Sequence, residues 1–252
     1  MTLWTIEPRD TLVLRSGRPM QGTGLQLQSL ELPRPATVAG FLRTRSASDE
    51  HGHFRHVGDQ EKCDELLQSS VAGPWLAAVG QDGTLEHLLP SPSDAVALEA
   101  GDEEHVELAR LGLRSQALRA GELSDHPADF EPLFLSVDRS SKPRPVPAYW
   151  NWTALSQWLE HPSSYCGNTD PTKLGRNLGP CEQRTHVQIN GDTGNSAEGM
   201  LFSLGHRRLV VLDQERMLSS ATRLCYVMKT DLEGLKPGSF PFAGERRIVH
   251  LE

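Results

Sequence analysis

Apolar and polar positions alternate clearly at the start of the chain. Residues 4–14 place Trp4 and Ile6 two positions apart and then run into a β-rich Thr-Leu-Val-Leu segment, which predicts a strand. A loop rich in glycine and proline follows over residues 15–35. Residues 36–45 come directly after a proline and repeat apolar residues at helical spacing, so they predict a helix. This strand–loop–helix opening suits an α/β or α+β sandwich.

The middle of the chain has weaker periodicity. Residues 61–71 predict a helix with an apolar stripe. Residues 73–79 and 84–89 predict two strands joined at Asp82-Gly83, a dipeptide typical of hairpin turns. Residues 90–147 are acidic, marked by prolines and weakly periodic, which predicts long surface insertions.

The last third of the chain has the most regular pattern. A short helix is predicted over residues 153–161, with Leu155, Trp158 and Leu159 facing inward. Four strands are expected to form two antiparallel hairpins, over residues 184–190, 198–204, 207–213 and 222–229. The sequence therefore predicts an α+β fold with an antiparallel sheet.

The net charge of −8 is unevenly distributed over the 252 residues. Residues 1–45 contain 6 Lys and Arg against 3 Asp and Glu, residues 46–141 contain 6 against 19, and residues 142–252 contain 13 against 11. The excess of acid therefore lies in one central block. The overall sign argues against a polyanionic partner, but the two net-positive ends keep a local basic surface open.

The sequence lacks the signatures of several common enzyme classes. It contains no GxxxxGK[ST], GxSxG, HExxH or CxxC pattern, so the phosphate-loop, hydrolase-elbow and zinc signatures are missing. It has no run of about 18 apolar residues and no secretion-signal pattern at its N-terminus. Four irregularly spaced cysteines fit a reducing compartment. We expect a cytoplasmic protein without cofactor, metal, membrane contact or DNA contact.

Three histidines, His51, His53 and His56, lie close together, with Cys63 and Asp64 a few residues further on. Imidazole is the commonest metal ligand, so a zinc or nickel site is one interpretation. An exposed polar loop is the favoured interpretation, because no tetrahedral ligand spacing is recognisable.

Glycine and positive charge come together over residues 172–179. Glycine allows backbone N–H groups to approach phosphate oxygens, which Lys173 and Arg176 would neutralise. The stretch runs into the predicted hairpin at 184–204, whose turn offers hydrogen-bonding groups such as Asn195. A basic hairpin that projects from a sheet suits single-stranded RNA. An ordinary solvated loop is the alternative.

His186 is the candidate general base in this region. It lies on a predicted strand near Lys173, Arg176 and Arg184. Metal-independent RNA cleavage needs a base, an acid and a cation around one phosphate. Packing or a backbone contact is the favoured role for a histidine on a strand.

Five blocks of the sequence follow one another in the order of a known family. They are residues 6–19, 35–44, 89–94, 198–202 and 242–247. The first contains Arg-Asp-Thr-Leu-Val-Leu-Arg-Ser-Gly-Arg-Pro, and the last is Phe-Ala-Gly-Glu-Arg-Arg. Jointly they resemble the third subunits of Cmr complexes, the RNA-guided type III-B CRISPR effectors, which belong to the repeat-associated mysterious protein (RAMP) superfamily. Ser16 and Ala243 depart from the aspartate and glycine of the family blocks.

The resemblance implies a RAMP fold built from ferredoxin-like (RRM-like) units with an antiparallel sheet, a projecting β-hairpin and long insertions. We expect an N-terminal ferredoxin-like domain over residues 1–215, with an acidic insertion at about 46–147 and the hairpin at about 172–204. Residues 216–252 would begin a second, incomplete ferredoxin-like unit, because family members continue beyond the Gly-Glu-Arg-Arg segment. The chain is then either a natural short form or a fragment.

The resemblance also implies a role in antiviral defence as a scaffold rather than as a nuclease. Such subunits hold the 5′ handle of the CRISPR RNA (crRNA) and dock on the large polymerase-like subunit and on a neighbouring RAMP backbone subunit. The RNA-binding residues that the resemblance suggests here are Arg15, Arg18, Arg43, Lys173, Arg176, Asn177, Arg184, His186, Asn195, Arg246 and Arg247. The acidic block would face solvent or a basic protein.

Some of these residues have a structural alternative. Arg18 would instead pair with an internal carboxylate, Arg43 would be a charge at a helix C-terminus, and Arg246 and Arg247 would form ion pairs. Two other functions stay open. One is a metal-independent endoribonuclease that processes repeat RNA with His186 as its base, as in related RAMP proteins. The other is a shortened decoy or inhibitor of the complex.

Overall fold

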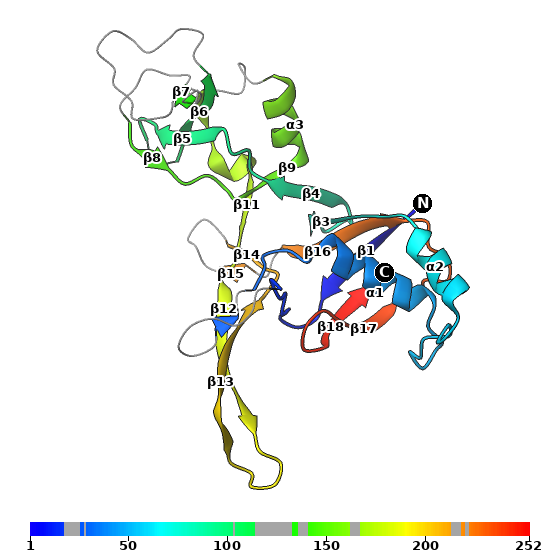
Figure 1. Ribbon diagram of the computed structural model, residues 1–252. Helices are drawn as coiled ribbons and strands as arrows, with labels where there is room; N and C mark the ends of the chain where they lie inside the picture. The colour runs from blue at the N-terminus through cyan, green and yellow to red at the C-terminus, as the bar shows by residue number, and fades with distance from the viewer. Residues whose placement is uncertain are drawn as a thin grey trace, which may run out of the picture. The chain divides into compact units, whose positions relative to one another are not determined.

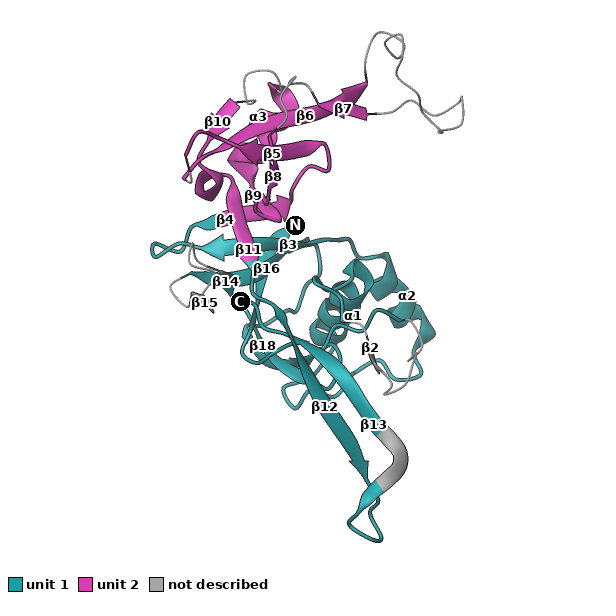
Figure 2. Cartoon of the chain, turned by 90° about the vertical axis from the view of Figure 1, so that its left-hand side faces the viewer, with its two compact units in different colours: residues 1–85, 178–252 teal, residues 86–177 magenta. Residues whose placement is uncertain are grey.

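The computed structural model describes residues 1–17, 26–27, 29–102, 104–113, 133–135, 141–161, 167–212, 218–219 and 222–252. These residues form two compact units (Figure 2). Unit 1 comprises residues 1–85 and 178–252, and unit 2 comprises residues 86–177. The expected boundaries at 46, 147 and 215 do not coincide with these limits.

Five antiparallel strands form the centre of unit 1 (Figure 1). In spatial order they are β3 (Val71–Val79), β16 (Arg223–Thr230), β1 (Thr2–Pro8), β18 (Arg247–Leu251) and β17 (Gly238–Phe242). The register places Trp4 opposite Met228 and Ile6 opposite Leu251. The expected α+β fold with an antiparallel sheet is confirmed.

Two helices belong to unit 1, α1 (Pro35–Ser46) and α2 (Gln60–Gln68). Helix α1 begins at a proline, whose missing N–H costs nothing in a first turn, and it buries Val38 and Leu42. The side chain of Asp59 caps α2 by accepting from the Lys62 N–H at 3.0 Å. The predicted continuation of this helix to residue 71 is wrong, because the chain there already pairs with β16.

The order of elements in unit 1 follows the first half of a ferredoxin-like fold. Strand β1 is followed by α1 and then by β3 and β16, with β16 between β3 and β1. Strand β18 occupies the position on the other side of β1 and is reached directly from β17. The core between the sheet and α1 contains Ile6, Leu42, Leu76 and Tyr226, all at most 1% exposed.

The pairing predicted for β16 is wrong. Strand β14 (Val211–Leu212) pairs with β15 (Leu218–Ser219), and β16 pairs with β3 and β1 instead of with residues 207–213. Five consecutive residues of β16 are buried, as is typical of a central strand covered on both faces. Its partners are therefore non-local, and a local hairpin pattern could not identify them.

The predicted hairpin is confirmed in β12 (Cys181–Ile189) and β13 (Ser196–Arg207). The short strand β2 (Gln26–Leu27) adds to β13 in parallel. Figure 1 shows the two long strands extending away from the five central strands of unit 1. The hairpin is therefore a two-stranded ribbon over most of its length.

Unit 2 is also built mainly of strands. They are β4 (Leu85–Pro90, which begins in unit 1), β5 (Ala95–Glu99), β6 (Val106–Leu113), β7 (Leu133–Leu135), β8 (Pro143–Arg144), β9 (Tyr149–Asn151), β10 (Gly167–Thr169) and β11 (Gly175–Leu178, whose last residue belongs to unit 1). Helix α3 (Trp152–Glu160) and the 3-10 turn η1 (Pro171–Lys173) complete the unit. Strands β10, β6, β5 and β8 form one antiparallel sheet.

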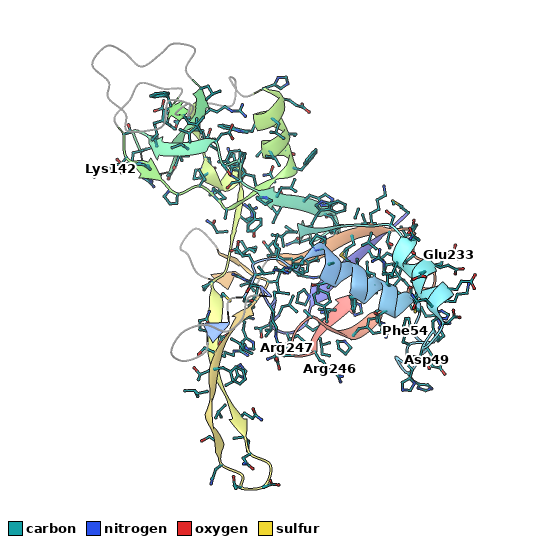
Figure 3. The ribbon with its side chains drawn as sticks, viewed as in Figure 1. Asp49, Phe54, Lys142, Glu233, Arg246 and Arg247 are labelled. Atoms are coloured by element: carbon teal, nitrogen blue, oxygen red, sulfur yellow. The ribbon has the colours of Figure 1, made fainter. Side chains whose placement is uncertain are left out.

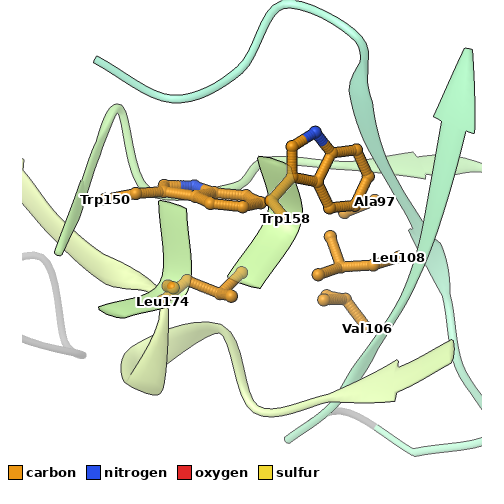
Figure 4. Close-up of a cluster of buried hydrophobic side chains, with 7 residues drawn as sticks. Ala97, Val106, Leu108, Trp150, Trp158 and Leu174 are labelled. Carbon is orange, nitrogen blue, oxygen red and sulfur yellow. The ribbon is translucent and has the colours of Figure 1, made fainter. Parts of the chain in front are cut away.

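Unit 2 has its own hydrophobic core (Figure 4). Trp150 and Trp158 pack edge to face with ring centroids 5.7 Å apart, and Leu108 and Leu174 are fully buried beside them. Trp158 also donates from Nε1 to Asp94 Oδ1 at 3.0 Å. The described parts of residues 90–147 therefore supply strands and core side chains, which differs from the surface insertions predicted there.

Helix α3 is confirmed, but its inward face differs in part from the prediction. Trp158 is fully buried, Leu155 packs against the core, and Leu159 is exposed. Ala154 is buried in place of Leu159, because it lies four residues before Trp158 on the same helix face. None of the helices in the described part of the chain is long and apolar enough to cross a membrane.

Candidate nucleic-acid interface

The base of the β12–β13 hairpin is joined to the segment that follows β1. Leu12 and Arg207 exchange backbone hydrogen bonds of 2.8 Å in both directions. The buried Arg207 side chain donates from Nη1 to the Gly179 carbonyl at 2.6 Å, and its Nη2 lies 3.8 Å from Glu31. These contacts attach the base of the hairpin to the segment around Leu12. The predicted strand over 4–14 is therefore interrupted after Pro8, with Leu12 in an isolated bridge.

A chain of polar contacts, which we call the polar chain, runs from β18 to the hairpin. Arg247 donates from Nη1 to Asp10 Oδ2 at 2.8 Å, and the Thr11 N–H donates to Asp10 Oδ1 at 2.7 Å. Thr11 Oγ1 lies 3.1 Å from Nδ1 of His206, and Nε2 of His206 lies 3.2 Å from Nε2 of His186. Figure 3 labels Arg247, the first residue of the polar chain.

The charges along the polar chain favour an ionised Asp10 and a neutral His206. The Thr11 backbone N–H, followed by the Arg247 guanidinium, lowers the pKa of Asp10. Burial of the His206 ring, helped by the positive charges of Arg184 and Arg247, lowers the pKa of His206. Arg247 thus forms an ion pair with Asp10, and an ion pair was the structural alternative left open for this residue.

Three aromatic rings lie roughly parallel on one face of the ribbon. The His186 ring is 5.5 Å from that of Phe202 at an interplanar angle of 13°, and 5.4 Å from that of His206 at 14°. Phe202 also packs against the buried pair Val13 and Leu204. His186 is therefore held by rings on both sides, in agreement with the packing role favoured for it.

Arg184 is half-buried on the same strand as His186. It forms two hydrogen bonds with Glu182, from Nε at 2.9 Å and from Nη2 at 2.8 Å. This contact lowers the pKa of Glu182. Because 57% of the Glu182 side chain is exposed, solvent screens the pair strongly, and a phosphate can compete for the guanidinium.

The turn between β17 and β18 brings a second arginine group to unit 1. Ala243, Glu245 and Arg246 all have positive φ, at 55°, 59° and 48°. Gly244 lies against the backbone of Val13, where a Cβ would come within 2.8 Å of the carbonyl oxygen. Arg15 donates to Glu245 at 2.7 Å, whereas Arg246 is exposed (Figure 3).

Arg43, predicted to bind RNA, is used inside unit 1. Its Nη2 donates to the carbonyls of Leu67 at 3.0 Å and Ser69 at 2.8 Å, so it joins the last turn of α1 to the end of α2. The carbonyls at a helix C-terminus lack intrahelical donors, and a guanidinium satisfies them well. We therefore do not include Arg43 in the candidate interface.

The glycine-rich stretch at 172–179 is ordered, and most of it is packed. A Cβ on Gly175 would come within 1.9 Å of the Tyr149 carbonyl, so this glycine allows β11 to lie against β9 and not against a phosphate. Arg176 donates to the carbonyls of Thr172 at 2.9 Å and Gly175 at 3.2 Å. Gly175 and Arg176 are therefore used within unit 2, and phosphate binding by this basic, glycine-rich stretch stays a prediction.

Three of the remaining predicted residues are described, two in unit 2 and one in the hairpin. Asn177 accepts from the Ala148 N–H at 2.9 Å, and the Lys173 side chain is 81% exposed, 4.0 Å from Asp170. Both belong to unit 2, whereas Asn195 is exposed in the turn of the hairpin in unit 1. Arg18 lies outside the described residues.

Metal-binding groups of three or more His, Cys, Asp or Glu side chains are not found among the described residues. His53 lies 3.4 Å from Asp49, and His51 lies 3.6 Å from Glu50, both exposed. The described thiols, Cys63, Cys181 and Cys225, are free.

Sequence reasoning missed the residues that hold the hairpin base, namely Thr11, His206 and Arg207. The two groups that contact each other, Thr11 and His206, are 195 positions apart in the sequence. The one available signal was the Arg-Asp-Thr segment within the first family-like block.

The sequence model of one family matches residues 4–252, and its description is CRISPR-associated protein (Cas_Cmr3). The chain belongs to this family. No curated protein matches the chain.

Two solved structures are similar to this Cas_Cmr3 family member. One is a chain of the type III-B Cmr-beta complex bound to cognate target RNA and AMPPnP, in state 1, with 17% identity and a TM-score of 0.51. The other is a chain of Cmr-beta bound to cognate target RNA, with 18% identity and a TM-score of 0.49. Each match covers 100% of this chain, which spans 62% and 63% of those chains. At this identity the first match shows a shared fold.

Proposed function

We propose that the chain is a non-catalytic RNA-binding subunit of a type III-B CRISPR effector. In this role it holds the 5′ handle of the crRNA and docks on the large polymerase-like subunit and on a neighbouring RAMP backbone subunit. The observation that carries the proposal is the Cas_Cmr3 family match over residues 4–252. The fold shared with a chain of an RNA-bound Cmr-beta complex supports it.

The RNA-facing groups in unit 1 are cations at or near the base of the hairpin. Arg246 is exposed, and Arg15 and Arg184 pair with the exposed carboxylates of Glu245 and Glu182. Exposed ion pairs contribute little free energy, so a phosphate can replace the carboxylate at low cost. His186, half-buried beside Arg184, adds a hydrogen-bonding ring, and Lys173 is an exposed cation of unit 2.

The contacts of His186 favour binding over catalysis. A metal-independent nuclease places an acid and a base on opposite sides of one phosphate. Here Nε2 of His186 and Nε2 of His206 are hydrogen-bonded to each other, and His206 is buried. An acid–base pair that spans a phosphate is therefore not preformed at this site.

Titration of a fluorescent crRNA handle with the purified chain tests the proposal. Arg246→Ala and Lys173→Ala should each weaken binding and reduce the slope of log Kd against log salt by about 0.9, because each removes one phosphate contact. Lys236→Ala is the matched control, since it removes an exposed charge at the other end of β17 from the Arg246 turn. Equal losses in all three variants would contradict the site.

Incubation of repeat RNA with the chain in EDTA separates the two RNA functions. The proposed scaffold leaves the RNA intact. Scission that is abolished by His186→Ala would favour the endoribonuclease.

A further inference from the structure

The turn between β17 and β18 is attached to the segment that follows β1. We call residues 243–246 the clamped turn. Three contacts join the two segments, namely Arg247 Nη1 with Asp10 Oδ2 at 2.8 Å, the Gly244 N–H with the Val13 carbonyl at 3.1 Å, and Arg15 Nη2 with Glu245 Oε1 at 2.7 Å. The side-chain partners are 237 and 230 positions apart in the sequence. The position of the turn is therefore set by a distant segment and not by its own residues alone.

The backbone of the clamped turn has a conformation that is unfavourable for its side chains. Glu245 and Arg246 follow one another with φ of 59° and 48°. Turns with two consecutive positive φ values normally carry Asn-Gly or Asp-Gly, because larger side chains crowd the backbone there. Long side chains persist in this region where the surrounding structure over-determines the backbone. The contacts with residues 10–15 therefore decide where the exposed Arg246 is presented.

Asp10 connects the two segments with a single carboxylate. Its Oδ2 accepts from Arg247, the residue directly after Arg246, and its Oδ1 accepts from the Thr11 N–H at 2.7 Å. The Arg247 side chain is 22% exposed, so this guanidinium is largely used inside unit 1. An acid beside phosphate-binding cations repels a polyanion. If Asp10 acted by its charge alone, it would weaken RNA binding.

We propose that Asp10 is a positioning residue for the RNA, which acts through Arg246 and does not contact the ligand. By holding Arg247 against the segment after β1, Asp10 fixes the clamped turn, so that Arg246 meets a phosphate without first having to be ordered. This inference rests on the proposed function, because it concerns how the same RNA-binding surface is preorganised. Charge and position give effects of opposite sign. Loss of the acid alone would tighten RNA binding, whereas loss of the clamp weakens it.

Titration of the fluorescent crRNA handle with Asp10→Ala, Arg246→Ala and the double variant tests the inference. Asp10→Ala should weaken binding about threefold or more and reduce the slope of log Kd against log salt by about 0.9, although it removes a negative charge. In the Arg246→Ala background, Asp10→Ala should cause no further loss, because the two residues act as a unit. Asp64→Ala is the matched control, since it removes an equal charge from an exposed position on α2 and should not weaken binding.

Asp10→Asn separates positioning from folding, because it keeps one acceptor oxygen for the two bonds that Asp10 accepts. This variant should weaken binding at the wild-type melting temperature. Tighter or unchanged binding by Asp10→Ala and Asp10→Asn, or an additive loss in the double variant, would overturn the inference alone. A wild-type chain that does not bind the handle RNA would overturn both the inference and the proposed function.

Discussion

Nε2 of His186 and Nε2 of His206 lie 3.2 Å apart, although neither ring is adjacent to the other in the strand register. A hydrogen bond between two such atoms needs one protonated and one unprotonated nitrogen. The bond is therefore lost when both nitrogens carry a proton. Because Thr11 and the buried environment hold His206 in place, the protonation of His206 is linked to the attachment of the hairpin.

Stability should therefore depend on pH through His206. Burial lowers the folded-state pKa of His206 below its ordinary value of 6.5, so the unfolded chain binds the proton more readily. The contribution of the neutral His206 to the free energy of unfolding is therefore fully present above about pH 6.5. It is lost as the pH falls through the lower folded-state pKa, because the unfolded chain binds the proton first. The groups that face the ring are Thr11, His186, Glu182, Arg184 and Arg247.

Urea unfolding between pH 7.5 and pH 5 measures this dependence. The His206→Gln variant should show a smaller fall in the free energy of unfolding on acidification than the wild-type chain. His51→Gln removes an exposed imidazole as a control and should keep the wild-type slope. Identical slopes for the wild-type chain and His206→Gln would show that this ring does not link protonation to folding.

Gly175 should be intolerant of any side chain. A Cβ there would come within 1.9 Å of the Tyr149 carbonyl and 2.7 Å of Trp150 Cα, so β11 and β9 would have to separate. Gly175→Ala should lower the free energy of unfolding by about 1–3 kcal/mol, the usual cost of overpacking. Gly112→Ala is the control in the same unit, since its Cβ would meet no atom within 4 Å. Equal thermal stability of the two variants would contradict the close β9–β11 contact.

Unit 2 should lose its fold when its central tryptophan is removed. Trp158 is fully buried, and Trp158→Ala should cost about 3–5 kcal/mol. Trp152→Ala, on the same helix but 56% exposed, should cost far less. In limited proteolysis, Trp158→Ala should be cut rapidly within residues 86–177. Trp152→Ala should not be cut rapidly there. Resistance of Trp158→Ala to cleavage would mean that this core does not hold unit 2 together.

Cys225 should be chemically inert in the folded chain. Burial raises its pKa to about 12, so very little reactive thiolate exists at pH 8. Iodoacetamide at pH 8, followed by peptide mass analysis, should modify the partly exposed Cys63 and Cys181 and leave Cys225 unmodified until urea is added. Rapid modification of native Cys225 would place its strand outside the core.

The elements that the sequence predicted well are those whose signal is local. Helix α1 is marked by Pro35 and by the spacing of Val38 and Leu42, all within 12 residues. The β12–β13 hairpin is marked by two β-rich runs around a turn of small polar residues. These patterns reflect backbone preferences and the need to bury one face, and neither depends on distant residues.

The features that the sequence did not predict depend on contacts between distant segments. The core of unit 2 combines Ala97, Leu108, Trp150 and Leu174, and each segment supplies too few apolar residues to signal burial alone. The burial of Gly175 is likewise decided by β9 rather than by its neighbours in sequence. The glycines and cations of residues 172–179 fit a phosphate-binding stretch when the sequence is considered alone, because the contact with β9 cannot be seen there.

The predicted RNA-binding residues likewise differ in whether a distant segment supplies a partner for their charge. The exposed cations Lys173 and Arg246 stayed available, whereas Arg43 and Arg176 donate to backbone carbonyls. An arginine beside unpaired carbonyls forms such bonds whenever the fold places them within reach. Sequence alone identifies the charge but not its partner.

Ultraviolet crosslinking of the assembled effector complex, followed by mass analysis of the RNA-linked peptides, tests the central claim most directly. We expect crRNA handle nucleotides on this chain at peptides around the hairpin base, which contain Arg15, Arg184 and Arg246. A chain that carries no RNA adduct in an active complex would contradict this account.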